Sequence, residues 1–72
     1  MPDDARSAAD WTAAFAARLG LEPPTPDVVD TLLDLAGVAA HASERTAAPI
    51  ACWLVGQASV SPAAALDLAR EI

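Results

Sequence analysis

Pairs of a hydroxyl residue and a proline divide this sequence into helical segments and limit the folds it can adopt. Thr25-Pro26 and Ser61-Pro62 each place a capping side chain before a proline at the first helical position, which is a strong helix start signal. The segment Leu21–Pro24 cannot continue a helix, because proline has a fixed φ and no amide donor. No segment alternates apolar and polar residues as a strand does. The sequence therefore predicts an all-α fold: a compact bundle of three main helices with a short fourth helix at the C-terminus.

Apolar residues at helical spacing set the expected boundaries of these helices. Trp11, Phe15 and Leu19 recur at i, i+4 and i+8 and form one stripe between a cap at Ser7 and a stop at Gly20. The other expected helices run from 26 to about 43 or 45, from 46 or 47 to about 59, and from 62 toward 72. Residues 1–6 are polar and are expected to form a flexible arm before a single domain, residues 7–72. Within the second helix, Gly37 is expected to mark a close helix crossing.

The apolar side chains of the chain are mostly small, so its core is expected to be thin. Hydrophobic residues make up 54% of the sequence, but 19 residues are alanine, which adds little area at about 25 cal/mol per Å² buried. The third helix is apolar almost all the way round, and we expect it to be enclosed by the other helices or half-buried in a subunit interface. Trp11 and Trp53 are expected in or near the core, with an anchoring role in an interface as the alternative.

The acidic charge argues against two classes of partner. The formal net charge is −6, and the chain has no lysine. Nucleic-acid binding needs a basic stripe that releases counterions, and anionic membranes also attract basic segments. The N-terminal sequence lacks the basic start and apolar run of a signal peptide, and no apolar stretch is long enough to span a membrane. We therefore expect a cytoplasmic protein that binds neither nucleic acid nor membranes.

Side chains suited to catalysis are few and separated. His41 is the only histidine, and Asp34 lies seven positions before it, about 10.5 Å along a helix axis. Cys52 is the only cysteine and lies in an apolar run, so we expect it to be buried and unreactive. No nucleophile elbow or phosphate-binding loop is present in the sequence. We expect no catalytic residue, no cofactor and no metal site within one chain; a metal enzyme remains open only if His41 residues of different chains meet.

His41 and Arg45 form the one polar corner of interest. They are four residues apart, one turn on a continuous helix, and Arg45 leads into Thr46 at the expected start of the third helix. The favoured interpretation is that both cations stabilise the C-terminal end of the second helix. The alternative is that they and the helix N-terminus bind a carboxylate or phosphate of a ligand or partner.

Several segments of the sequence resemble a family of small helical domains from actinobacteria, known as domain of unknown function 6457. The segments that carry the resemblance are Asp30–Ala36, Ala40-His41, Arg45, Ala47–Pro49, Leu54–Gly56, and Asp10-Trp11 through Leu19–Leu21. Members of that family occur alone or joined to domains that resemble molybdenum-cofactor guanylyltransferase. The resemblance implies an accessory role near the synthesis of molybdopterin guanine dinucleotide.

Two positions depart from the pattern of that family. Thr46 stands where the family often has proline, and Ile50–Trp53 replaces a more usual Leu-Thr-x-Phe. If threonine hydroxyls in that family touch a ligand, this chain has lost them, which favours a packing role for the segment.

These observations favour a non-enzymatic accessory or interaction domain. Its expected partner is a protein, a nucleotidyltransferase of molybdenum-cofactor assembly by the resemblance, or a second copy of the chain. The alternative function is a domain that binds a small anion, nucleotide or pterin. The candidate interaction or anion-binding residues are His41, Arg45, Thr46 and Trp53.

Overall fold

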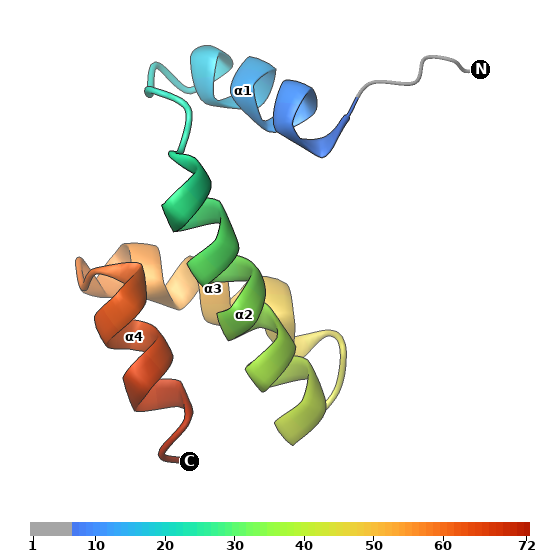
Figure 1. Ribbon diagram of the computed structural model, residues 1–72, viewed down its shortest axis with the longest axis vertical. Helices are drawn as coiled ribbons and strands as arrows, with labels where there is room; N and C mark the ends of the chain where they lie inside the picture. Colours follow the sequence, from blue (N-terminus) through green and yellow to red (C-terminus); the bar gives the residue numbers. More distant parts are fainter. Residues whose placement is uncertain (1–6) are drawn as a thin grey trace.

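Four helices and no strand make up residues 7–72, which are the residues that this computed structural model describes; the expected arm, residues 1–6, lies outside them. The helices are α1 (Ala8–Arg18), α2 (Pro26–Ala42), α3 (Ala47–Ala58) and α4 (Pro62–Ala69). Figure 1 shows α4 beside α2 and α3 crossing behind them, and α2 contacts both α3 and α4. The predicted all-α bundle is confirmed.

Three of the helices begin at hydroxyl caps, as the sequence predicts. Each capping oxygen accepts a hydrogen bond from the amide three residues later, which satisfies one of the free donors of the first helical turn. The pairs are Asp10 N to Ser7 Oγ at 3.0 Å, Val28 N to Thr25 Oγ1 at 3.3 Å, and Ala64 N to Ser61 Oγ at 3.2 Å. The starts of α1, α2 and α4 are therefore fixed locally, before any tertiary contact is considered.

Helix α1 ends in a Schellman motif centred on Gly20. This glycine has a φ of +77°, the left-handed region that side chains disfavour. The Leu21 amide donates to the carbonyl of Ala16 at 2.8 Å, and the Gly20 amide donates to the carbonyl of Ala17 at 3.1 Å. The predicted glycine stop is confirmed.

Helix α2 ends at Ala42, close to the first of the two expected ends. Its C-cap, Ser43, has φ −141° and ψ −103°, which turns the chain out of the helix. Arg45 therefore lies in the loop before α3 and is not one helical turn from His41. The expectation that α2 reaches Arg45 is wrong.

The core forms where α3 and α4 pack on α2. Leu35 of α2 is only 2% exposed and contacts Ala65 and Leu66 of α4. Half-buried residues pack around these three: Val38, Ala51, Cys52 and Val55. Besides this cluster, Ala16 is the only other buried hydrophobic residue of the part described, so the core is as thin as the composition predicts. Cys52 is half-buried against the cluster, less covered than expected.

Both tryptophans are exposed, contrary to the expectation that they lie in or near the core. Trp11 is 54% exposed and Trp53 is 62% exposed. Helix α1 makes almost no contact with the other helices and stands at the N-terminal end of α2 (Figure 1), so these helices leave its stripe about half exposed. Helix α3 contacts α2 on one side and contains no buried residue, so the other helices do not enclose it. Helical periodicity identified the apolar faces correctly, but the packing covers only some of them.

Gly37 does not mark a close helix crossing. A Cβ atom placed at this position would meet no heavy atom within 4 Å. The glycine lies on an open part of α2, beside a shallow hollow that includes Leu33 and His41.

We predict that Leu35→Ala destabilises the domain by about 2 to 5 kcal/mol, because it removes the most buried side chain and leaves a cavity. Leu33→Ala is the matched control in the same helix: Leu33 is 66% exposed, and its truncation is expected to change stability by less than about 0.5 kcal/mol. Urea unfolding followed by circular dichroism measures both. Equal losses for the two variants would contradict this description of the core.

We predict opposite effects for alanine at two glycines. Gly37→Ala is expected to stabilise the domain by up to about 1 kcal/mol, because alanine favours a helix interior and the site is open. Gly20→Ala is expected to destabilise it by about 1 to 2 kcal/mol, because the left-handed φ of +77° strains a Cβ. Thermal unfolding of the two variants beside the parent chain tests the pair, and a stabilised Gly20→Ala would show that the Schellman motif does not form.

Candidate interaction surface

Helix α3 has one covered side and one open side. Its covered side consists of Ala51, Cys52 and Val55, which pack against Leu35. At 100° per residue, a second set of side chains lies opposite them. We call this set the α3 outer face; its members, all exposed, are Pro49, Trp53, Gly56 and Gln57.

Trp53 dominates the α3 outer face. Its side chain is 62% exposed, and the neighbouring Ile50, at the edge of the face, is 60% exposed. An exposed indole does not contribute the stabilisation that large aromatic side chains usually provide when they are buried in a fold. The face has the features of an anchor for a partner: a rigid aromatic group with small or polar neighbours.

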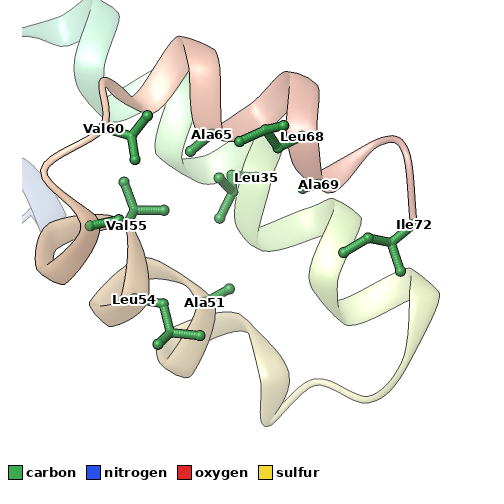
Figure 2. A pocket seen from close by; sticks show the side chains of 10 residues that line it. Leu35, Ala51, Leu54, Val55, Val60, Ala65, Leu68, Ala69 and Ile72 are labelled. Carbon is green, nitrogen blue, oxygen red and sulfur yellow. The ribbon is translucent and has the colours of Figure 1, made fainter.

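A second apolar surface is the groove between α3 and α4. Both helices pack on α2 but barely touch each other, which leaves a trough with Leu35 at its base (Figure 2). Two adjoining hollows of about 250 and 390 Å³ make up this α3–α4 groove, and both are lined by Ala51, Leu54, Ala69 and Ile72. Ser43 supplies the only polar side chain among the residues that line it. The groove is thus suited to apolar side chains and not to an anion.

The predicted polar corner is not assembled as a single site. His41, Arg45 and Thr46 are all exposed, but His41 borders a hollow with Leu33, Asp34, Gly37 and Val38, on the outer side of α2. Neither Arg45 nor Thr46 lines that hollow. His41 does lie in the last turn of α2, where a positive charge interacts favourably with the helix dipole, as in the capping interpretation.

The N-terminus of α3 offers few donors to an anion. Thr46 adopts helical angles, φ −66° and ψ −16°, and its side chain makes no capping hydrogen bond. The first two helical amides are already used: Ala47 N donates to the Glu44 carbonyl at 2.9 Å, and Ala48 N donates to the Arg45 carbonyl at 3.1 Å. The next residue is proline, which has no amide hydrogen. The helix-terminus donors that an anion site would use are therefore occupied or missing.

Within residues 7–72, no group of three or more histidine, cysteine, aspartate or glutamate side chains is placed to hold a metal ion. Over the same residues, none of the helices combines the length and the apolarity that crossing a bilayer requires.

Sequence reasoning missed the α3–α4 groove. Leu68 of α4 and Ile72, three residues beyond the end of α4, line this groove and are 56% and 102% exposed. One feature of the sequence could have indicated the groove. Helix α3 is apolar nearly all round, and one neighbouring helix can cover only one side of it, so some apolar surface has to stay uncovered.

Comparison with known proteins gives a family and nothing closer. No curated protein and no solved structure matches the chain significantly. The model of the family described as a domain of unknown function, DUF6457, matches residues 3–72, which is almost the whole chain. The fold and the apolar surfaces described above are therefore those of a domain that belongs to the DUF6457 family.

Proposed function

We propose that this domain is a non-enzymatic protein-interaction domain that docks on a larger protein through the α3 outer face. One observation carries the proposal: within residues 7–72 only four hydrophobic residues are buried, and Trp53 is left 62% exposed. Tryptophan is among the residues most enriched at the energetic centre of protein interfaces.

The surroundings of Trp53 favour a protein over other partners. The face combines an indole with proline, glycine and glutamine and carries no charged side chain. With a net charge of −6, the chain lacks the basic surface that phosphate groups of nucleic acids or lipid headgroups require. An apolar partner surface with basic residues at its rim would complement both features.

The positions of the few reactive side chains support a non-enzymatic role. His41 lies exposed on the outer side of α2, and Cys52 packs against the core cluster around Leu35. General acid–base or nucleophilic catalysis needs such groups within hydrogen-bond reach of one another, beside a substrate. Their separation fits a domain that binds and positions another protein.

The resemblance of the sequence to domains joined to guanylyltransferase-like domains suggests the partner: a nucleotidyltransferase of molybdenum-cofactor assembly. A cytoplasmic location would accompany this partner. A second copy of the chain is the other partner that the sequence suggests.

We predict that the purified guanylyltransferase of the same genome binds this domain through Trp53. In a Trp11→Phe variant, Trp53 is the only tryptophan of the domain, so its fluorescence reports on the α3 outer face. Complex formation is expected to protect this indole from iodide quenching. Calorimetry is expected to show binding weakened about 30-fold or more by Trp53→Ser, the effect of losing an interface hot spot.

Leu33→Ser is the matched control, because Leu33 is 66% exposed on the outer side of α2, away from Trp53. It is expected to bind like the parent domain. Unchanged quenching on addition of the partner, or equal loss of binding in Trp53→Ser and Leu33→Ser, would contradict docking through the α3 outer face.

The same proposal predicts that phosphate, GTP and a pterin leave the His41 imidazole signals unchanged in an NMR titration. The reason is that the first amides of α3 are already hydrogen-bonded or lack a proton. A saturable shift of His41 with any of these probes, reduced by Arg45→Ala, would instead support the small-ligand alternative.

A further inference from the structure

Helix α1 presents an apolar stripe that the other helices of the described residues, 7–72, leave about half exposed. Trp11, Phe15 and Leu19 are 54%, 50% and 57% exposed. The two aromatic rings lie against each other, with centroids 5.2 Å apart at an interplanar angle of 31°. The stripe is thus a continuous apolar surface of about 12 Å, at 1.5 Å per residue from the first to the last of these residues.

A different side of α1 faces its own chain. Ala9 and Thr12 border a hollow whose other wall includes Pro23, Pro24 and Pro26. Small side chains thus face the connector, while the large ones point elsewhere. The position of α1 in this structure leaves its most apolar side available for another contact.

The α3–α4 groove is a matching apolar surface. Along α2 it extends from Leu35 to Ala42, about 10.5 Å at 1.5 Å per residue, which is close to the length of the α1 stripe. Its walls come from two helices whose backbones share few contacts, so large apolar side chains such as those of the α1 stripe can enter between them. Figure 2 shows Leu54 and Leu68 on opposite sides of this space.

The connector keeps α1 away from the groove of its own chain. Glu22, Pro23 and Thr25 each precede a proline, which restricts them to extended backbone. Thr25 shows this directly, with φ −72° and ψ 158°. With this connector α1 stands at the N-terminal end of α2 (Figure 1), whereas the groove begins at Leu35, nine residues after Pro26. A helix from a second molecule meets no such restriction.

We propose that two copies of this chain exchange their first helices: the stripe of Trp11, Phe15 and Leu19 of one copy packs in the α3–α4 groove of the other, and reciprocally. Reciprocal exchange closes the assembly as a two-fold dimer, because each copy uses its one stripe and its one groove. A stable interface buries about 1,600 Å² in total, so the two stripes and two grooves need to contribute about 400 Å² each.

The acidic charge of the chain predicts how the stability of this dimer changes with salt concentration. Each copy carries a formal net charge of −6, so two copies repel each other over long range, and the contacting surfaces are almost entirely apolar. Added salt screens the repulsion and leaves the apolar contact in place. The dimer is therefore expected to tighten as salt is raised, unlike one held by ion pairs.

This exchange is independent of the proposed docking on a larger protein, because it uses the α1 stripe and the groove and leaves the α3 outer face open. Trp53→Ser is expected to remain a dimer, so failure of one idea does not imply failure of the other.

Size-exclusion chromatography with light scattering of the full chain tests the exchange. The parent chain is expected to be a dimer, and Phe15→Ser in the stripe and Leu68→Ser in the groove are each expected to weaken dimerisation at least 10-fold. Both side chains are half-exposed or more, so circular dichroism is expected to show the parent helix content. Leu33→Ser, at an exposed site outside both surfaces, is the control and is expected to dimerise like the parent. A parent chain that stays monomeric at millimolar concentration would overturn the proposal.

An isotope-filtered NMR experiment distinguishes exchange from other dimers. In a mixture of labelled and unlabelled chains, contacts are expected between Trp11 ring protons of one copy and Leu54 or Leu68 methyl groups of the other. Contacts of Trp11 with those methyl groups within a monomer would show that α1 folds back onto its own groove. Contacts between the α3 helices of two copies would show a different dimer. Either result overturns the exchange.

Discussion

The contact of Leu35 with α4, and with the α3 side chains around it, holds helices α2, α3 and α4 together. This leucine is the one large side chain removed almost completely from water, and it lies where α3 and α4 meet α2. The other two buried residues of this cluster are Ala65, which adds little apolar area, and Leu66, which is 8% exposed. A fold that depends on so few contacts leaves most of its large apolar residues at the surface.

The small number of tertiary contacts also explains why α1 stands apart from the other helices. Its ends are fixed locally, by the Ser7 cap and the Schellman motif at Gly20, so it forms without help from the core. The prolines of the connector then direct it away from α3 and α4. A helix that forms through local interactions and has few tertiary contacts can contact another molecule. The α1 stripe is therefore a second candidate interaction surface, in addition to the α3 outer face.

The candidate site could be predicted only in part. For Trp53 the favoured expectation was a place in or near the core, with an anchoring role in an interface as the alternative. Its 62% exposure contradicts a place in the core, because periodicity identifies an apolar face but does not say how many neighbours a helix has. The corner of His41 and Arg45 assumed a continuous helix, and the turn at Ser43 separates them. The end of the helix at one residue, Ser43, therefore removed the one-turn spacing of His41 and Arg45 that the sequence had predicted.

By itself the sequence determined the all-α class, the starts of α1, α2 and α4, and the glycine stop of α1. These features depend on interactions between residues at most five positions apart, which can be recognised from the order of residues in the sequence. Three outcomes followed only from the packing of the helices: which apolar faces are covered, the groove between α3 and α4, and the exposure of Trp11 and Trp53. These outcomes depend on the orientation that the connectors give each helix relative to the others, and the spacing of apolar residues does not specify that orientation.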